Sequence, residues 1–470
     1  MLLFIIDMRT RKEIHKIEKA ILKKSVEAPA QALDKTIAIG NQLNHSVPMV
    51  AVSKKSKDYW HMLGPGFTTG ASDDDPSGIA TYSQAGAQFG FQTLWLSIFT
   101  FPLMSVVQEM CARIGIVTGR GLAANIRRHF PKKIIYISAL LLFAANAFNI
   151  GANLGAMAQA VQMLNPRIAF WPLVVGFTAL SFGLQIFTPY VRYARYLKWL
   201  ALMLLAYIAS AFMANLDWGN VLQSAVTPSI HFDKNYLLIL CAILGTTISP
   251  YLFFWQTSQE VEEQILQGKT KIGDRQGADA KDIKGMRVDV WSGMLLSNIV
   301  MFFIIATCGA LLFGNGITDI KTASQAAEAL RPFAGDATYL LFAIGIIGTG
   351  MLSIPVLAGA SSYALAESFK WREGLYYKLH QAHAFYGLII ISMMIGMALN
   401  FIGLDPFKTL IYSAVVNGLV APVILALIVI ISSNKKVMGE WVNKRSTTVI
   451  GWFVTILMAL AGAGAIYALL

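Results

Sequence analysis

The chain has 470 residues, of which 56% are hydrophobic and only 14% are charged, and its mean hydropathy is +0.56. A soluble protein carries about 25% charged residues, so the composition excludes an ordinary soluble enzyme or binding domain. The formal net charge of +12 would by itself also fit a nucleic-acid-binding protein, and only the placement of the basic residues separates the two classes.

The apolar residues fall in long runs of about 18 to 25 residues, the length of a helix that crosses a bilayer. Because the runs are continuous and do not alternate, they favour helices over a barrel. We predict an all-α polytopic membrane protein in which residues 1–60 form a basic, partly helical cytosolic tail and residues 61–470 form one transporter domain. Eleven transmembrane helices are expected, at 62–88, 93–116, 134–164, 168–188, 197–216, 236–265, 288–313, 336–366, 384–402, 407–431 and 448–469.

The basic residues are distributed unevenly between the predicted loops. If the N-terminus is cytosolic, the external loops hold only five of the 38 Lys and Arg residues, namely Arg167, Lys234, Lys321, Arg331 and Lys408. This asymmetry follows the positive-inside rule. We therefore expect a cytosolic N-terminus and an external C-terminus, with no nucleic-acid partner. The short external loops and the lack of a signal-peptide pattern favour a bacterial inner (plasma) membrane.

Two of the predicted spans contain a proline beside small polar residues. Residues 73–78 of the first span read Asp-Asp-Asp-Pro-Ser-Gly, and residues 245–250 of the sixth read Gly-Thr-Thr-Ile-Ser-Pro. Proline removes a backbone donor and clashes with the preceding helical turn. The two spans are five helices apart and therefore cross the membrane in opposite directions. This pattern predicts an inverted 5+5 repeat of the leucine-transporter type, in which discontinuous first and sixth helices bind ions or substrate near the midplane.

Asp75 is the strongest candidate ligand at these breaks. A carboxylate within the membrane is costly unless it is paired, so it indicates function. We predict a cation site in which Asp75 supplies charge, and in which carbonyl groups near Asp75 and Thr246 and the Ser249 hydroxyl supply neutral oxygen atoms. Because successive side chains on a helix point in different directions, we expect Asp73 and Asp74 to be vestibule charges or helix-packing partners instead of ligands.

Several short motifs closely resemble those of the Nramp family of divalent-metal transporters. The resemblance is densest over residues 63–130 and around 245–256, and elsewhere it consists mainly of hydropathy and helix count. The motifs are GPGF at 64–67, DP at 75–76, QAGAQFG at 84–90 and ARIGIVTGR at 112–120.

The chain also departs from the family pattern. The family motif Asp-Pro-Gly-Asn is Asp-Pro-Ser-Gly at 75–78, and the family motif Met-Pro-His is Ser-Pro-Tyr at 249–251. A second family histidine on the sixth helix is replaced by Gln256. The Asp and Glu that serve the family's proton pathway are best matched by Asn146 and Asn149. At these positions the chain resembles the Nramp-related magnesium-transporter branch.

The resemblance implies a metal site formed by Asp75, Gly78, Thr246, Ser249 and Asn417, the last on the tenth helix, which borders the metal in the family. Oxygen-only sites suit Mg²⁺, Ca²⁺ or Mn²⁺ better than softer metals, and Mg²⁺ keeps several of its waters. We therefore expect a transporter, not an enzyme, that imports Mg²⁺ and/or Mn²⁺ as substrate, requires no cofactor and is weakly or not coupled to protons. The sequence leaves the oligomeric state open.

Other functions remain as alternatives. One is a proton-coupled Mn²⁺ or Fe²⁺ symporter, and another is a sodium-coupled transporter of a small organic solute on the same fold. An intramembrane aspartyl protease would need a second facing aspartate, which is not evident. A receptor or scaffold that binds metal without transport is the fourth alternative.

Two further groups of charged residues are ambiguous. Glu109 precedes Arg113 by four residues, so the two can form an ion pair on one helix face. Residues 259–263, Gln-Glu-Val-Glu-Glu, either line an exit vestibule or form a solvated helix end.

Overall fold

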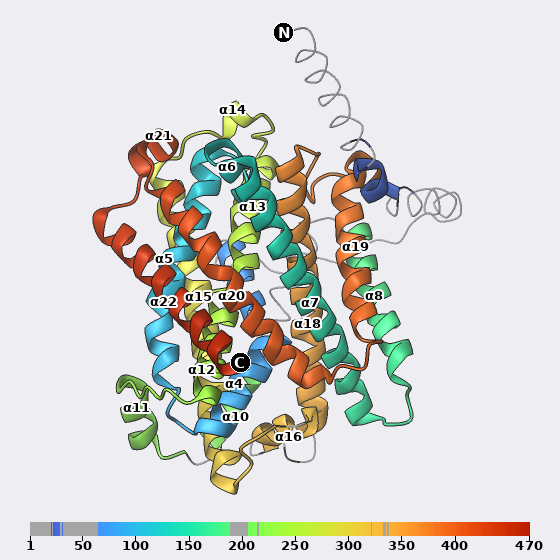
Figure 1. The fold of residues 1–470 in the computed structure, drawn as a ribbon, viewed down its shortest axis with the longest axis vertical. Coiled ribbons are helices and arrows are strands. Elements are labelled where there is room, and N and C mark those ends of the chain that lie inside the picture. The colour runs from blue at the N-terminus through green and yellow to red at the C-terminus, as the bar shows by residue number, and fades with distance from the viewer. Residues whose placement is uncertain are drawn as a thin grey trace, which may run out of the picture.

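The structure is a computed structural model that describes residues 64–188, 205–213, 216–320, 322–331 and 338–470, with residues 20, 22–28, 31 and 335. Most of the predicted tail, residues 1–60, therefore lies outside the described residues. All regular elements of the described part are helices, arranged as a bundle (Figure 1). The all-α prediction is confirmed.

Eight helical segments of the described residues are long and apolar enough to cross a membrane. They are α5 (Trp95–Thr118), α7 (Lys132–Leu164), α8 (Phe170–Phe187), α12 (Lys234–Thr247) with α13 (Pro250–Leu266), α15 (Ala280–Leu311), α18 (Thr338–Phe369), α20 (Pro406–Ser432) and α22 (Arg445–Leu469). The three other predicted spans coincide with shorter helices. These are the pair α3 (Pro65–Asp73) and α4 (Pro76–Phe89), then α10 (Leu205–Met213) and α19 (His383–Leu399).

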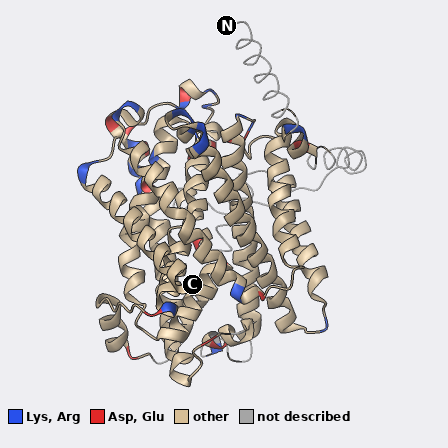
Figure 2. Ribbon diagram, viewed as in Figure 1, with Lys and Arg blue, Asp and Glu red and all other residues tan. Residues whose placement is uncertain are grey.

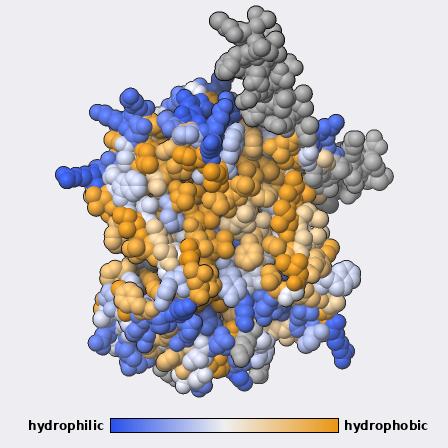
Figure 3. Space-filling view, viewed as in Figure 1, coloured by the Kyte–Doolittle hydropathy of each residue, from blue (hydrophilic) through white to orange (hydrophobic). Residues whose placement is uncertain are grey.

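Short helices join the long ones at the two ends of the bundle. They are α6 (Leu122–His129), α11 (Trp218–Val226), α14 (Ile272–Arg275), α16 (Ala323–Ala327) and α21 (Lys435–Met438), with the 3₁₀ turns η2 (Phe313–Asn315), η3 (Glu328–Leu330), η5 (Leu379–Gln381) and η6 (Gly439–Trp441). Lys and Arg gather around α6, α14 and α21 (Figure 2), and we call this the basic end. Between the two polar ends, the surface carries an apolar belt (Figure 3). Large apolar side chains of the long helices are exposed, among them Leu140, Trp171 and Leu460, as expected where helices meet lipid.

The broken helices lie inside the bundle because glycines let them approach their neighbours closely. A methyl group on Gly70 of α3 would lie 2.2 Å from the carbonyl oxygen of Gly293 on α15. A methyl group on Gly245 of α12 would lie 2.1 Å from the carbonyl oxygen of Ala414 on α20. Small residues at such crossings are typical of membrane helices. The two breaks are thus surrounded by other helices.

Asp289 of α15 holds the first turn of α3. Its carboxylate accepts hydrogen bonds from the backbone N–H groups of Gly64 at 2.8 Å, Gly66 at 2.7 Å and Phe67 at 3.1 Å. A helix start leaves such N–H groups without partners and favours negative charge. Asp289 therefore anchors α3 to α15 beside the first break.

Candidate metal site

Both broken helices stop and restart in the same way. α3 ends at Asp73 and α4 begins at Pro76, while α12 ends at Thr247 and α13 begins at Pro250. Each proline occupies the first helical position, where its missing N–H breaks no helical hydrogen bond. The two residues between the halves are non-helical in each case. The predicted discontinuities are therefore confirmed, and they expose backbone groups in the interior.

Asp75 caps the start of α4 and is 1% exposed. Its Oδ1 accepts hydrogen bonds from the Gly78 backbone N–H at 2.9 Å and from the Ser77 hydroxyl at 2.5 Å. Its Oδ2 accepts from the amide groups of Asn153 at 3.0 Å and Asn149 at 3.3 Å, both on α7. These donors are all neutral, so hydrogen bonds hold the carboxylate in position while leaving its charge uncompensated.

Residues of α18 and α20 contact the two asparagines that donate to this carboxylate. The Asn153 amide also donates to the Ser353 hydroxyl at 3.0 Å, and the Ser413 hydroxyl donates to the Asn149 side-chain oxygen at 3.1 Å. One turn beyond Ser413, Asn417 is buried and neither of its side-chain polar atoms has a hydrogen-bond partner. Such orphaned groups call for an ion or water molecules. The region around Asp75 thus has oxygen atoms available for a hydrated cation.

The other predicted ligands lie at the junction of the two broken helices. A methyl group on Gly78 would lie 3.1 Å from the Thr246 hydroxyl oxygen, so α4 and α12 meet there. The Ser249 hydroxyl donates back to the carbonyl oxygens of Gly245 at 2.6 Å and Thr246 at 2.7 Å. The hydroxyl proton of Ser249 is therefore donated within its own chain segment, while the lone pairs of its oxygen atom remain available to bind a cation. The ligand roles of these residues stay predictions.

Sequence analysis did not identify Asn153, Ser353 or Ser413. A usable signal was present, because Asn146, Asn149 and Asn153 follow each other at helical spacing and share one face of α7. On that face, the Asn146 amide donates to the Leu357 carbonyl and the Ser361 hydroxyl of α18, at 3.1 and 3.0 Å. The partners on α18 and α20 could not be found from sequence, because they depend on helix neighbours.

Asp73 and Asp74 were predicted to be vestibule charges or helix-packing partners, and the first of these alternatives is wrong. Both are fully buried, so they are not vestibule charges. The Ser297 hydroxyl of α15 lies 2.6 Å from Asp73 Oδ2 and 3.2 Å from Asp74 Oδ1. Because α3 ends at Asp73, the assumption of a continuous helix was wrong and two successive side chains reach one group. Their contact with α15 agrees with the packing alternative.

The expected pair on α5 is confirmed: Glu109 Oε1 lies 3.6 Å from Arg113 Nη1. Two residues of α15 add contacts that the sequence did not predict. Arg287 lies 2.8 Å from the same carboxylate oxygen, and the Trp291 indole N–H donates to the other at 2.9 Å. Glu109 therefore joins α5 to α15.

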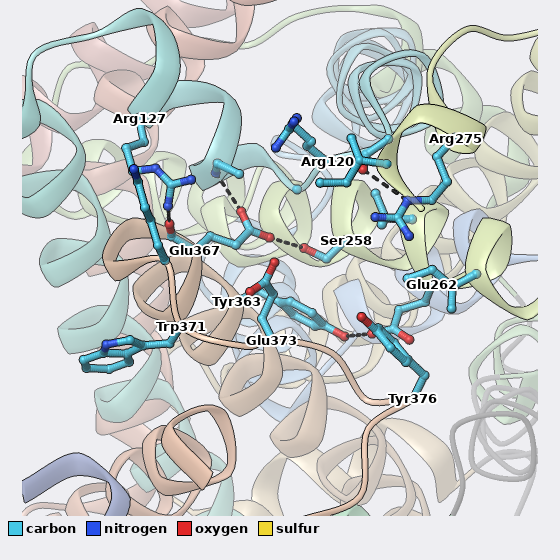
Figure 4. A pocket seen from close by; sticks show the side chains of 17 residues that line it. Arg120, Arg127, Ser258, Glu262, Arg275, Tyr363, Glu367, Trp371, Glu373 and Tyr376 are labelled. Carbon is cyan, nitrogen blue, oxygen red and sulfur yellow. Dashed lines mark hydrogen bonds between the residues drawn. The ribbon is translucent and has the colours of Figure 1, made fainter. Parts of the chain in front are cut away.

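A cavity of about 340 Å³ opens at the basic end between α6, α13 and α18 (Figure 4). Glu262 lines it and is buried, accepting from the Tyr363 hydroxyl at 2.5 Å and the Leu375 N–H at 2.7 Å. Gln259 and Glu260 are also buried. A solvated helix end at residues 259–263 is therefore wrong for these three side chains.

Glu373, half-buried after the end of α18, faces the same cavity (Figure 4). Burial raises the pKa of its carboxyl to about 7, although Arg127, Arg275 and Arg120 oppose the increase. This carboxyl therefore titrates in the neutral range and lies outside the membrane-spanning helices.

The described residues contain no group of three or more His, Cys, Asp or Glu side chains arranged to hold a metal ion. A site with a dense protein cage, such as structural zinc sites have, is thus absent from this part of the chain. The groups around Asp75 are instead one carboxylate and neutral oxygen atoms, which together with water form the kind of site that Mg²⁺ usually occupies.

The family model described as "Natural resistance-associated macrophage protein-like", or Nramp, matches residues 66–468. The chain belongs to the Nramp family. It resembles the Divalent metal cation transporter MntH of Klebsiella pneumoniae, with 26% identity over 85% of this chain and 92% of the relative. The MntH of Deinococcus radiodurans is also 26% identical, over 85% of this chain and 88% of the relative.

Solved structures agree with the Nramp assignment at the level of the fold. A manganese transporter of Eremococcus coleocola superposes with a TM-score of 0.68 at 18% identity, covering 89% of each chain. Mhp1, a nucleobase-cation-symport-1 family transporter, gives a TM-score of 0.51 at 14% identity, covering 86% of this chain and 90% of Mhp1 in its inward-facing form. This Nramp chain is therefore a multi-pass membrane transporter of the leucine-transporter type and not an enzyme.

Proposed function

We propose that this Nramp chain imports Mg²⁺, Mn²⁺ or both through a site centred on Asp75, with little or no proton coupling. The observation that carries the proposal is the buried Asp75 carboxylate, which has only hydroxyl, amide and backbone N–H partners. Carboxylate, carbonyl and water oxygens suit Mg²⁺ and Mn²⁺. The similarity to the MntH divalent metal cation transporters and to the Eremococcus manganese transporter supports a divalent metal as the substrate.

In this proposal the ion keeps part of its water shell. Asp75 binds it directly, and the oxygen atoms where Gly78 of α4 meets Thr246 of α12 lie beside it. Asn417, whose polar atoms lack partners, accepts hydrogen bonds from metal-bound water, and Ser249 offers its oxygen lone pairs. Retained water suits Mg²⁺, which dehydrates reluctantly.

The absence of coupling rests on the side chains that touch Asp75. Asn149, Asn153 and Ser77 neither take up nor release protons near neutral pH, so none of these three side chains can accept a proton from Asp75. Transport would then follow the gradient and the membrane potential. A divalent cation gains about 4.6 kcal/mol per 100 mV, since each charge gains about 2.3 kcal/mol, which is enough to favour uptake.

We also propose that the basic end faces the cytosol, as the positive-inside rule predicts. The Lys and Arg of α6, α14 and α21 then lie inside (Figure 2), with the N-terminus cytosolic and the C-terminus external. The proposed membrane is the inner (plasma) membrane of a bacterium.

The replacement Asp75→Asn tests the site. Asparagine caps a helix about as well as aspartate, so the variant keeps the α4 start and removes only the charge. We expect it to abolish Mg²⁺ and Mn²⁺ uptake into proteoliposomes. Unchanged uptake would refute the assignment of the ion to Asp75.

Asp405→Asn is the matched control. Asp405 caps α20, precedes Pro406 and accepts from the Lys408 N–H at 3.0 Å, which repeats the Asp-Pro cap of Asp75 at an exposed position. Normal uptake by this variant would show that a lost cap charge alone does not impair transport.

Proton-coupled Mn²⁺ symport is the second candidate, because the relatives and the Eremococcus structure are named for manganese or divalent metals. It differs from the main proposal in one measurable quantity, the movement of protons with the metal.

A further inference from the structure

Asp73 and Asp74 are buried carboxylates without a counter-charge. Each side chain is 0% exposed. Among the described residues, neither one forms an ion pair with a Lys, Arg or His nitrogen within 4.0 Å. Buried carboxylates are paired, neutralised or bound to a metal, so this pair requires a partner.

The two carboxylates converge on one point of α15. Asp73 Oδ2 and Asp74 Oδ1 lie 2.6 and 3.2 Å from the same Ser297 hydroxyl oxygen. The two oxygen atoms are therefore no further apart than the sum of these distances. Asp75 contacts α7 instead, so the pair and Asp75 have different helices as neighbours.

Several oxygen atoms around the pair lack partners. Asp73 Oδ1 and Asp74 Oδ2 accept no hydrogen bond. The Tyr82 hydroxyl of α4 is fully buried and has no hydrogen-bond partner, and it lies close enough to Thr246 and to the carboxylates of Asp73 and Asp74 to interact with them electrostatically. A buried phenol hydroxyl without a partner beside two carboxylates is an observation independent of the acidic pair, and such a group calls for a ligand.

The end of α3 adds further negative potential. The last carbonyl groups of a helix have no partner within it, and its C-terminus favours cations. The Ser72 carbonyl is taken by the Tyr251 hydroxyl at 2.8 Å. The Asp73 carbonyl oxygen lies 3.1 Å from the position of a methyl group on Gly78, where α4 meets α12.

We infer that Asp73, Asp74 and Ser297 form a second site for a hard divalent cation, with the Tyr82 hydroxyl as a further oxygen donor. Two carboxylates, neutral oxygens and retained water match the way proteins hold Mg²⁺. The site is distinct from the one proposed at Asp75. It requires only that the pair stay ionised and bind metal; the count of two ions expected below rests also on the site proposed at Asp75.

Mn²⁺ is the probe, because its electron paramagnetic resonance spectrum reports both binding and the closeness of a second Mn²⁺. We expect the purified full chain to bind two Mn²⁺ in equilibrium dialysis, both displaced by excess Mg²⁺, with dipolar broadening of the spectrum at saturation. The double variant Asp73→Asn/Asp74→Asn, of nearly equal volume, should bind one Mn²⁺ and lose the broadening.

Ser297→Ala keeps both carboxylates, and it is the second test of the site if the double variant does not fold. It should weaken the second Mn²⁺ several-fold and leave the first unchanged. Asp405→Asn should keep both ions, which separates the site from surface carboxylates.

One bound Mn²⁺ in the wild type, unchanged in the double variant, would overturn the inference and would mean that Asp73 and Asp74 are protonated instead. Failure of the transport site has a different signature: Asp75→Asn would then retain uptake, whatever the number of bound ions.

Discussion

Ser249 is the second of the two residues in the break of the sixth helix, and its hydroxyl donates to carbonyl groups of its own segment. A methionine there would remove these hydrogen bonds and place a thioether at the junction with Thr246. Thioether sulfur favours softer metals. We expect Ser249→Met to raise Cd²⁺ uptake relative to Mg²⁺ uptake in proteoliposomes. An unchanged ratio would mean that position 249 does not face the ion.

Glu373 makes stability depend on pH. Its carboxyl has a pKa of about 7 in the folded chain, against an ordinary value of 4.5. Between these values the unfolded chain releases a proton that the folded chain keeps, so this group lowers stability as pH rises, and the effect is constant above about pH 7.

We therefore expect Glu373→Gln to match the wild type in thermal stability below about pH 4.5 and to exceed it increasingly up to pH 7. The measurement is the unfolding midpoint in detergent across this range. Exposed Glu440→Gln is the control. A difference between Glu373→Gln and wild type that does not vary with pH would contradict the assignment.

Single residues were predictable where the chain itself marks them. Asp75 stands beside a proline in an apolar span, so its place at a break could be inferred. The role of Ser297 could not be predicted, because a serine in an apolar helix does not indicate which helix packs against it. For Asp73 and Asp74 the vestibule alternative was wrong, because the point where α3 ends decides the direction of their side chains.

Close packing of α3 on α15 is the feature that positions the first break. A methyl group on Gly70 would meet the backbone carbonyl of Gly293 at 2.2 Å, and backbone cannot move aside without shifting a helix. Overpacking of this kind costs about 1–3 kcal/mol. We expect Gly70→Ala to lower the unfolding midpoint and to reduce uptake.

Gly183→Ala is the matched control for that substitution. Gly183 lies within α8, and nothing stands within 4 Å of a methyl group there. Alanine favours a helix over glycine by about 1 kcal/mol, so this variant should be as stable as the wild type or slightly more so. Equal loss in both variants would contradict a specific role for the α3–α15 contact.

The anchoring of α3 by Asp289 predicts a second effect on this element. Asp289→Ala removes an acceptor for three backbone N–H groups, and hydrogen bonds to charged groups are worth about 1.5–3 kcal/mol each. The start of α3 should then separate from α15 more often. We expect faster thiol labelling of Ser72→Cys, a buried position, when Asp289→Ala is added. Unchanged labelling would mean that packing alone holds α3.

Helix breaks were predictable as elements because proline acts locally. The neighbours of each broken helix were not. The contacts of α4 with α7, α15 and α20 join segments far apart in the sequence, and apolar spans of similar composition do not specify their partners. For the same reason, Asn153 and Ser353 entered the candidate site only with the structure.

At the scale of the whole molecule, hydropathy was sufficient to predict an all-α membrane bundle, since lipid imposes long apolar helices on any such chain. The uneven placement of Lys and Arg agrees with the basic end seen in Figure 2. The choice of metal and the coupling of transport to protons depend on a few side chains in the interior. Both must therefore be measured in a transport assay.

The most direct measurement is Mg²⁺ uptake into proteoliposomes at fixed membrane potential, with Mn²⁺ and Ca²⁺ compared and a lumenal dye reporting pH. The account predicts that Mg²⁺ enters without acidification of the lumen and that Asp75→Asn abolishes this uptake. Mn²⁺ uptake with acidification and no Mg²⁺ flux would contradict it, because proton coupling would then persist despite the asparagines that surround Asp75.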